Sequence, residues 1–490
     1  MRWTVEEVAR ALGVTPPGGL DALARLAGVS IDSRTVARGE LFVAIHGPRH
    51  DGHDYVVAAL DSGALAAVVA QDRAAGLPEA VRPRLFAVED TLAALQGVAQ
   101  AVRARWGRRL AGVTGSAGKT TTKEILAALL AARFRVLKSE GNLNNEYGLP
   151  LQLLRLEDAD EAAVVELGMS RAGELRRLTE IARPDVGVVT RVAPVHLEFF
   201  ASVDDIALAK RELIEGLTGR DSVAVLNSDD PRVAHFAQVA PGRVVTFGFS
   251  SGADFRAENI SDRGMDGSDF DLLGPEGRAR LTLPLAGRHN ISNALAALAA
   301  ASVWGVGATE AKEIFPHLQA TGMRGRALRY DAGFAVINDC YNSNPVALGA
   351  MIDLLARTPA QGRRILAAGE MLELGPSSSE LHREAGRAAA TAGNLEWIIG
   401  VQGDAEAFVR GAIAAGHPSA RTQFFPSSIE AADFITTLVA RGDLLLVKGS
   451  RGVKMERVVE ALDKRFPRLN PEPAVTASRS GTTTTARERD

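Results

Sequence analysis

A glycine-rich segment between an apolar stretch and a helix-like stretch carries the residue types needed to bind phosphate. The segment Thr114–Thr122 reads TGSAGKTTT and precedes the helical pattern Lys123–Leu130. In a strand–turn–helix of this kind the backbone N–H groups of the turn converge, and the helix N-terminus adds partial positive charge. Lys119 can reach the outer phosphates, and a hydroxyl at Thr120 or Thr121 can ligate Mg²⁺. The segment therefore predicts a nucleoside triphosphate site.

The match to the strict phosphate-loop pattern is incomplete. The first glycine of that pattern would stand at Val113, and Gly115 lies only three positions before Gly118. An ordinary turn between a strand and a helix is the alternative interpretation. The apolar run before the segment and the helical pattern after it favour nucleotide binding.

Two further polar residues follow apolar runs, where ligands bind in open parallel sheets. Glu166 comes directly after one run, and a carboxylate there can hold a metal that bridges phosphates. His196 follows another run in a loop that contains Pro194, and it can ligate a metal or carry a proton. A surface carboxylate and a structural histidine are the alternatives. The functional interpretation is favoured because Glu166 and His196 are predicted to lie at the same end of the sheet as the glycine segment.

The elements that would position these residues predict an α/β fold with three domains. Residues 1–84 suggest a small α/β unit, and residues 85–320 suggest a mostly parallel sheet because apolar runs alternate with helical patterns. Residues 321–466 predict a second, Rossmann-like doubly wound sheet, and residues 467–490 a disordered tail. The predicted strands of the two larger domains lie at Leu110–Val113, Ala162–Val165, Val186–Val189, Val223–Leu226, Ala335–Ile337, Ile365–Ala368, Trp397–Val401, Gln423–Phe425 and Leu444–Val447.

Bulk composition excludes several classes of protein. The net charge of −3 argues against a general nucleic-acid binder, and the single cysteine, Cys340, excludes an intramolecular disulfide. The first residues are acidic where a signal peptide needs an apolar core. The longest apolar run, 294–308, is rich in alanine and predicts a packed helix rather than a membrane span. We therefore expect a cytoplasmic protein that binds no nucleic acid and does not insert into a membrane.

Two segments stay ambiguous from residue patterns alone. The stretch from Asp204 to Leu217 has the pattern of an amphipathic helix, and nothing in it singles out Lys210. Asn290 or Ser292 can cap the helix that follows, whereas Asn290 and Asn293 together can touch a nucleotide. Both interpretations remain open at this point.

Taken together, these motifs resemble the ATP-dependent Mur ligases, and within them the MurF branch. The loop is similar to the family's T-G-x-x-G-K-T-T segment, with Ala117 where asparagine is frequent. The resemblance implies that Lys210 becomes carbamylated, and that Thr120, Glu166, His196 and Lys210 hold Mg²⁺. It also implies ATP contacts at Gly115, Ser116, Ala117, Gly118, Lys119, Thr120, Thr121, Asn290, Asn293, Arg326 and Asp339, and substrate contacts at Asn142, Asn144 and Asn145.

Motifs in the outer domains extend the resemblance from about residue 30 to residue 457. The segment Asp339–Pro345 (DCYNSNP) is similar to a signature of the MurF branch. The segments Ala368–Gly375 and Lys448–Arg451 are similar to other motifs of the family. The first domain resembles the segments that hold a uridine nucleotide. Arg191 departs from the family, which usually has asparagine there. The implied substrate residues are Ser33, Arg34, Asp51, Gly52, His53, Tyr341, Asn342 and Asn344.

The resemblance implies a ligase that forms an amide bond. ATP would phosphorylate the terminal carboxylate of UDP-MurNAc-tripeptide, and D-alanyl-D-alanine would attack the acyl phosphate. Lys119, His196, Lys210 and Arg326 would be catalytic, and we expect a monomer. The third residue of the tripeptide, lysine or diaminopimelate, stays open. A folylpolyglutamate synthase and a phosphate-loop NTPase that only switches or binds are the alternatives.

Overall fold

The computed structural model describes residues 3–47 and 50–469, whose contacts divide them into two compact units. The first unit runs to Thr321 and includes the segments Asn344–Leu354 and Leu372–Leu381, and the remaining residues form the second unit. Sheets of four and nine strands belong to the first unit, and a six-stranded sheet belongs to the second. The three domain boundaries drawn from the sequence stay predictions. Of the predicted tail, residues 470–490 lie outside the described residues.

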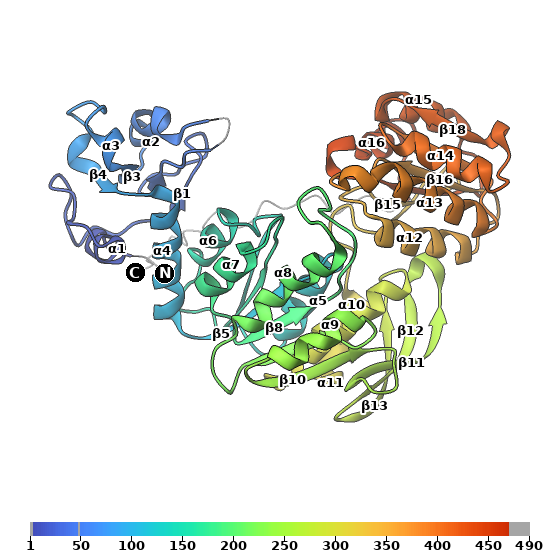
Figure 1. Cartoon of the computed structure of the whole chain (residues 1–490), viewed down its shortest axis with the longest axis horizontal. Helices are drawn as coiled ribbons and strands as arrows, with labels where there is room; N and C mark the ends of the chain where they lie inside the picture. Colours follow the sequence, from blue (N-terminus) through green and yellow to red (C-terminus); the bar gives the residue numbers. More distant parts are fainter. Residues whose placement is uncertain (1–2, 48–49, 470–490) are drawn as a thin grey trace, which may run out of the picture. The chain divides into compact units, whose positions relative to one another are not determined.

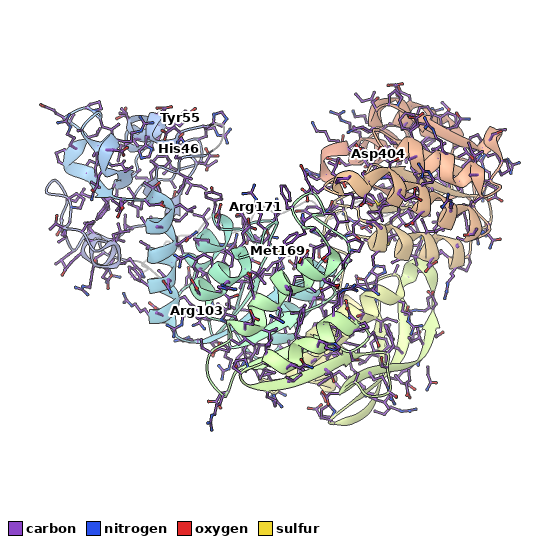
Figure 2. All side chains as sticks on the ribbon, viewed as in Figure 1. His46, Tyr55, Arg103, Met169, Arg171 and Asp404 are labelled. Carbon is purple, nitrogen blue, oxygen red and sulfur yellow. The ribbon has the colours of Figure 1, made fainter. Side chains whose placement is uncertain are left out.

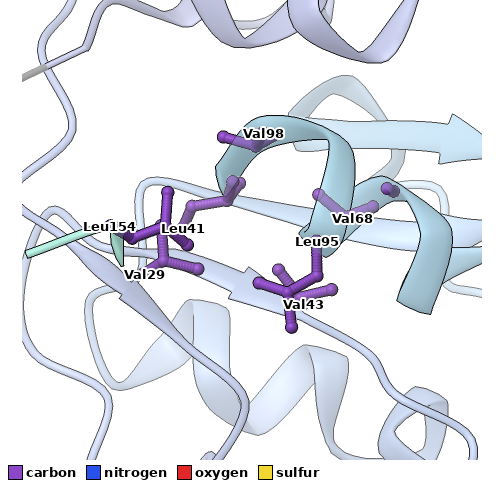
Figure 3. Close-up of a pocket in the computed structure, with 8 residues that line it drawn as sticks. Val29, Leu41, Val43, Val68, Leu95, Val98 and Leu154 are labelled. Atoms are coloured by element: carbon purple, nitrogen blue, oxygen red, sulfur yellow. The ribbon is translucent and has the colours of Figure 1, made fainter. Parts of the chain in front are cut away.

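The four-stranded sheet is parallel throughout and is packed against a long helix. Its strands run in the order β1-β2-β3-β4, at Val29–Ser30, Leu41–Val43, Ala66–Ala70 and Leu85–Val88. Helix α4 (Thr91–Trp106) follows and also contacts α6 (Gly148–Leu153) and α7 (Glu174–Ala182) (Figure 1). Apolar side chains of the sheet and of α4, with Leu154 at the end of α6, enclose a narrow gap (Figure 3), which has no room for a water molecule. This interface is therefore a dry apolar core, not a ligand cavity.

The nine-stranded sheet combines a parallel part with an antiparallel extension. Its order is β13-β12-β11-β10-β9-β8-β5-β7-β6. The strands from β5 to β10 are parallel, and β5 lies between β7 and β8. The strands of the parallel part are β5 (Arg109–Thr114), β6 (Val136–Lys138), β7 (Ala162–Glu166), β8 (Val186–Val189), β9 (Val223–Asn227) and β10 (Arg243–Gly248). The chain builds one side of the sheet from β5 and then the other, so the end of β5 is a switch point where ligands bind.

Both faces of this parallel part are covered, which explains the continuous apolar runs in its strands. In β7, Ala162 and Val164 face the core shared with α5 (Lys119–Leu130) and α10 (Arg288–Ser302). Ala163 and Val165 face the opposite core, to which α7 and α8 (Val203–Glu215) contribute. Helix α10 buries alanine on every side, and α5 packs directly against it. The small alanine side chains allow these two helices to approach closely.

The antiparallel extension was not predicted from the sequence. Strands β11 (Phe255–Asp262), β12 (Ser268–Gly274) and β13 (Gly277–Leu283) are joined in antiparallel order at the edge of the sheet. Buried and more exposed positions alternate along β12. Such half-buried strands have no continuous apolar run, so a search for runs misses them.

The six-stranded sheet of the second unit is doubly wound, as predicted. Its order is β14-β15-β19-β16-β17-β18, and only the pair β14–β15 is antiparallel. The strands are β14 (Arg326–Arg329), β15 (Ala335–Asp339), β16 (Arg364–Gly369), β17 (Trp397–Val401), β18 (Thr422–Phe425) and β19 (Leu444–Lys448). All five apolar runs predicted as strands in this region form strands.

The remaining helices complete the chain. They are α1 (Val5–Leu12), α2 (Val56–Asp61), α3 (Gln71–Ala74), α9 (Pro231–Ala234), α11 (Ala308–Ile314), α12 (Pro345–Arg357), α13 (Ser378–Thr391), α14 (Ala405–Ala414), α15 (Ser428–Leu438) and α16 (Glu456–Arg465). The alanine-rich run 294–308 is interrupted, because α10 ends at Ser302 and α11 begins at Ala308. Within residues 3–47 and 50–469, no helix combines the length and the apolar character of a membrane span.

Replacing Arg103 tests the junction between α4 and α7. Its buried guanidinium (Figure 2) donates to the carbonyls of Ala182 and Arg183 at 2.8 and 2.9 Å. Arg103→Met leaves those carbonyls without this donor, so we expect the free energy of unfolding to fall by about 2–3 kcal/mol. Urea unfolding followed by tryptophan fluorescence measures it. Arg105→Met is the matched control, because Arg105 makes a half-exposed ion pair with Glu7 worth at most about 1 kcal/mol. Equal losses in the two variants would contradict the assignment.

Candidate active site

The glycine segment forms a tight cradle at the switch point of the nine-stranded sheet. Gly115 and Gly118 have φ angles of 149° and 86°, in the region that side chains disfavour. A Cβ at Gly115 would lie 1.9 Å from Thr190 Oγ1, and one at Gly118 would lie 2.3 Å from Asn293 Oδ1. Only glycine therefore fits at either position. Gly118 is also the N-cap of α5, whose first turn receives no side-chain cap from the described residues. Those N–H groups suit a phosphate.

Lys119 lies directly over this cradle. Its Nζ donates to the carbonyl of Gly115 at 2.8 Å, so its ammonium lies over the loop. The segment is thus a ring of backbone donors with one lysine above it, which fits the charge and shape of a polyphosphate.

Ser116, predicted to contact the nucleotide, is engaged by a neighbouring loop. Its N–H donates to Arg191 O at 2.7 Å, and its hydroxyl exchanges hydrogen bonds with the backbone of Ala193 at 2.9 and 3.1 Å. Thr190 Oγ1 donates to Ala117 O at 2.6 Å. These bonds join the glycine cradle to the loop that leads to His196.

Glu166 is the carboxylate at the centre of the site. It ends β7 and is buried, and Thr120 Oγ1 donates to its Oε2 at 2.6 Å. Asn144 Nδ2 donates to the other oxygen, Oε1, at 2.8 Å. One carboxylate therefore contacts both the nucleotide helix and the asparagine loop. Hard oxygen groups of this kind beside a phosphate cradle are ligands that Mg²⁺ accepts.

Lys210 is buried on α8 without a neutralising anion. Its side chain is 2% exposed, and no hydrogen bond or ion pair joins it to any described residue. Burial, and secondarily the nearby charge of Lys119, lowers the pKa of the Lys210 amine well below its usual value. The amine is therefore held closer to its neutral form than an exposed lysine.

His196 lies in a strained backbone conformation. Its φ is 56°, in the left-handed region that residues other than glycine rarely adopt. Its Nδ1 lies 2.5 Å from Oε2 of Glu373, whose segment groups with the first unit. The hydrogen bond from His196 lowers the pKa of the Glu373 carboxyl, against the opposing effect of burial. The histidine is thereby held by a carboxylate through one ring nitrogen.

The predicted metal residues do not form a metal site from carboxylates, histidines and cysteines alone. In the part of the chain that the structure describes, no three such side chains gather closely enough. The predicted set needs a threonine hydroxyl and a modified lysine in addition to Glu166 and His196. It stays a prediction.

The asparagines of α10 do not cap the helix. Gly287 is its N-cap, so the capping hypothesis for Asn290 and Ser292 was wrong. Asn290 Nδ2 donates to Ala286 O at 2.8 Å, and Asn293 Nδ2 donates to Asn290 Oδ1 at 3.1 Å. With Asn293 placed against Gly118, this pair lies at the cradle, where a nucleotide contact is feasible.

The asparagine loop contributes one of its three predicted residues directly to the site. Asn144 holds Glu166, whereas Asn145 Oδ1 accepts from the N–H of Gly148 at 2.9 Å and so shapes the start of α6. The carbonyl of Asn142 accepts from the N–H of Asn144 at 2.8 Å. Asn142 and Asn145 therefore fix the shape of the loop.

In the second unit, Asp339 and Lys448 are partners on adjacent strands. Lys448 is buried, and its Nζ donates to Asp339 Oδ2 at 2.6 Å and to Asn342 O at 2.8 Å. The ring of Tyr341 lies 3.9 Å from the guanidinium carbon of Arg324. Asn344, which groups with the first unit, accepts through its Oδ1 from the N–H of Ala347 at 2.9 Å and caps α12. Arg326 begins β14.

In the first domain, the predicted uridine residues form two local clusters. Ser33 lies in a turn where Arg34 pairs with Asp32, and that hydrogen bond lowers the pKa of Asp32 to about 2. Asp51 pairs with Arg73 and with the buried His53, whose Nδ1 lies 2.6 Å from Asp51 Oδ1.

The hydrogen bonds around Asp51 affect its pKa and occupy the ring of His53. Burial raises the pKa of Asp51, but the hydrogen bonds from His53 and Arg73 outweigh it and lower the pKa overall. Ala70 N donates to His53 Nε2, so both ring nitrogens of His53 are engaged within the protein. Gly52 has no room for a Cβ, which would lie 2.7 Å from Ile45 N.

Comparison with known proteins agrees with this geometry. Three Mur ligase descriptions match the chain: the catalytic domain of the family over residues 25–103, the middle domain over 113–301, and the glutamate ligase domain over 323–451. The chain is 34% identical over 435 residues to the UDP-N-acetylmuramoyl-tripeptide–D-alanyl-D-alanine ligase of Bacillus subtilis, covering 89% of this chain and 93% of that one.

Solved structures show the same likeness. A MurF crystal structure from Acinetobacter baumannii superposes with a TM-score of 0.84 at 28% identity, covering 95% of this chain and 99% of that one. MurF of Thermotoga maritima in complex with ADP gives a TM-score of 0.78 at 29% identity, covering 89% and 97%. The chain belongs to the Mur ligase family. The predicted α/β class with mainly parallel sheets is confirmed.

Several residues that shape this Mur ligase site were missed from the sequence. Asp230 Oδ2 accepts from Val192 N at 2.8 Å, and Asn227 Nδ2 donates to Thr190 O at 2.7 Å, so both hold the loop that leads to His196. Asn227 ends β9, and its place after an apolar run was an available signal. Lys448 was noted only as part of a motif, because strand order alone makes it the neighbour of Asp339.

Replacing Gly118 tests the cradle. Gly118→Ala adds a Cβ against Asn293 and strains a positive φ, so we expect ADP affinity to fall at least about tenfold, as expected for a loss of 1.4 kcal/mol or more. Gly219→Ala is the matched control, because Gly219 has the same φ of 86° with nothing within 4 Å of its added Cβ. Both variants carry the same backbone strain, so a difference between their ADP affinities, measured by titration calorimetry, reports the clash with Asn293. Equal ADP affinity in the two variants would contradict the role of Gly118.

Proposed function

We propose that this chain catalyses the ATP-dependent addition of D-alanyl-D-alanine to UDP-MurNAc-tripeptide, a step of peptidoglycan precursor synthesis. The relatives of that name match 89% of the chain at 34% identity. The observation that carries the proposal is the pair of hydrogen bonds on Glu166, because they join the nucleotide loop to the asparagine loop that resembles the family's substrate loop.

The reaction joins a carboxylate and an amine by way of an acyl phosphate. A carboxylate oxygen of the tripeptide attacks the γ-phosphorus of ATP, and ADP leaves with the electron pair of the broken bond. The amine of D-alanyl-D-alanine then attacks the acyl carbon, phosphate leaves, and the nitrogen loses a proton. The first step brings two anions together, which is unfavourable at low dielectric unless cations compensate them.

Residues of the first unit can supply this compensation. Lys119 lies at the cradle, and its charge is close enough to Lys210 to affect the pKa of that amine. Mg²⁺, when bound, would neutralise phosphate charge at oxygens supplied by Thr120 and Glu166. His196 and carbamylated Lys210 complete the proposed metal set. Arg326 near the phosphates and Asp339 at the ribose remain assignments from family resemblance.

Carbamylation of Lys210 is supported by its surroundings. A neutral amine adds to CO₂ and loses a proton, which gives a carbamate with two oxygens and one negative charge. Burial without an anionic partner among the described residues makes the ammonium form of Lys210 costly. The carbamate places an anion beside the cation of Lys119. The modification thus replaces a repulsive pair by an attractive one.

The substrates of the proposed reaction indicate where the enzyme works. ATP and UDP-linked precursors are cytoplasmic compounds, which supports a cytoplasmic location. A monomer stays a prediction.

Product analysis tests the proposal. The chain is incubated with ATP, Mg²⁺, D-alanyl-D-alanine and UDP-MurNAc-tripeptide carrying either lysine or diaminopimelate at position three. We expect mass spectrometry to show the ligated nucleotide-pentapeptide and phosphate release that requires both acceptor and dipeptide. Phosphate release without a ligated product would indicate an NTPase. In a parallel incubation with a folate and glutamate, a ligated product, together with none from the muramoyl substrate, would indicate a folylpolyglutamate synthase.

Replacing Lys119 tests charge compensation at the cradle. Lys119→Met keeps most of the side-chain length and removes the ammonium, so we expect kcat to fall by at least about 10²-fold. A steady-state phosphate-release assay measures it. Lys312→Met, at an exposed position of α11, is the control and keeps wild-type kcat. Turnover of Lys119→Met within a few fold of wild type would refute the role.

Lys210 can be tested by isotope labelling. With ¹³C-bicarbonate we expect a carbamate resonance in the wild-type NMR spectrum and none in Lys210→Arg. Because burial, and secondarily Lys119, lowers the pKa of the folded amine, more of it is neutral at a given pH than for an exposed lysine, and the resonance weakens as the pH falls and the amine becomes protonated. Lys210→Ala should be inactive and partly rescued by a short carboxylic acid. Full activity of Lys210→Ala would eliminate the role.

A further inference from the structure

A second buried lysine lies one helical turn beyond Lys119 and is not part of the proposed reaction. Lys123, on α5, is 1% exposed, and its Nζ donates to Ser139 O at 2.5 Å and lies 3.0 Å from Glu124 Oε1. Removing an ammonium from water is costly, and pairing with an anion seldom returns more than that cost. A buried lysine is therefore poorly explained by stability alone, and its partners indicate what it positions.

Ser139 is the residue at which β6 passes into the asparagine loop. Its N–H donates to Val164 O at 3.0 Å and continues the pairing with β7. Its hydroxyl accepts the N–H of Glu166 at 3.0 Å. Lys123 thus binds the residue whose hydroxyl accepts the backbone N–H of Glu166, the central carboxylate.

The loop that starts at Ser139 returns to the same strand end. Asn144 donates through its side chain to Glu166 Oε1 and accepts through its carbonyl the N–H of Gly168, each at 2.8 Å. The asparagine loop is therefore fixed at two points on the end of β7, and Lys123 connects the first of these points to the nucleotide helix.

The geometry points to Lys123 as a positioning residue for the tripeptide substrate. Through Ser139 it holds the asparagine loop in register with Glu166 and with the helix that begins at the phosphate cradle. This inference rests on the proposed function, in which the asparagine loop contacts the UDP-MurNAc-tripeptide. Lys123 touches neither the cradle nor a reacting group, so its loss acts on the tripeptide and not on the nucleotide.

Lys123→Met removes the donor while keeping an unbranched buried side chain. Glu124 keeps its other partner, Lys138, at 2.5 Å. Titration calorimetry on the full chain is expected to show about tenfold weaker binding of UDP-MurNAc-tripeptide, because a buried carbonyl loses its charged donor. Binding of ATP without Mg²⁺ should stay within about twofold of wild type. Lys138→Met is the matched control, because it breaks the Glu124 pair without touching Ser139, and it should bind the tripeptide as wild type does.

A double-mutant cycle with Asn144→Ala separates positioning from general damage. If Lys123 acts through the loop, its loss has little further effect once Asn144 is gone, so the combined loss of affinity is smaller than the product of the single losses. Independent losses that multiply would overturn the inference. Ser139→Ala keeps the carbonyl that Lys123 binds and removes the hydroxyl that accepts from Glu166 N, so it breaks the next link of the same connection and should also weaken tripeptide binding. If Lys123→Met does not fold, wild-type tripeptide binding by Ser139→Ala would overturn the inference.

Different results would contradict the proposed function and the role of Lys123. Wild-type protein that does not bind UDP-MurNAc-tripeptide would contradict the proposed function. Wild-type protein that binds it, together with folded Lys123→Met or Ser139→Ala that bind it equally well, would contradict only the role of Lys123.

Discussion

The two hydrogen bonds on the Glu166 carboxylate hold the parts of the central site together. One oxygen is held by the first turn of the nucleotide helix and the other by the asparagine loop, and the backbone of the same residue is held by Ser139. A buried carboxylate is costly unless each oxygen is satisfied. The elements around Glu166 are therefore constrained to one arrangement, and a cation that enters meets oxygens already in place.

This constraint depends on the order of strands in the nine-stranded sheet. Placing β5 between β7 and β8 brings Glu166 to one side of the cradle and Thr190 to the other. The helices on both faces bury every residue of β7 and β8, so a shift in register of either strand would require both close-packed cores to repack. Because the strand ends are fixed, Gly115 stays close to Thr190 and Gly118 stays close to Asn293.

Much of this arrangement was predictable from the sequence, because apolar runs mark fully buried parallel strands and polar residues follow them. The predictions failed where that signal is absent. Strands β11 to β13 alternate charged and apolar residues, so they contain no run. The bonds of Ser116 to Arg191 and Ala193, and the enclosure of His53, depend on contacts between distant segments that no local pattern encodes. Asn290 showed the opposite error, since a good capping residue was one turn too late to cap.

The two buried lysines of the first unit show why residue type alone does not assign a role. Lys123 faces a carboxylate and a carbonyl, and these partners keep an ammonium in place as a fixed donor. Lys210 is buried with no anion among the described residues to offset that burial, and the charge of Lys119 adds to the effect, so the pKa of its amine is lowered and the neutral, nucleophilic form is favoured. Identical side chains with nearly identical burial thus differ in chemistry because their neighbours differ in sign. The electrostatics of the surroundings, rather than depth in the fold, separates a structural lysine from a reactive one.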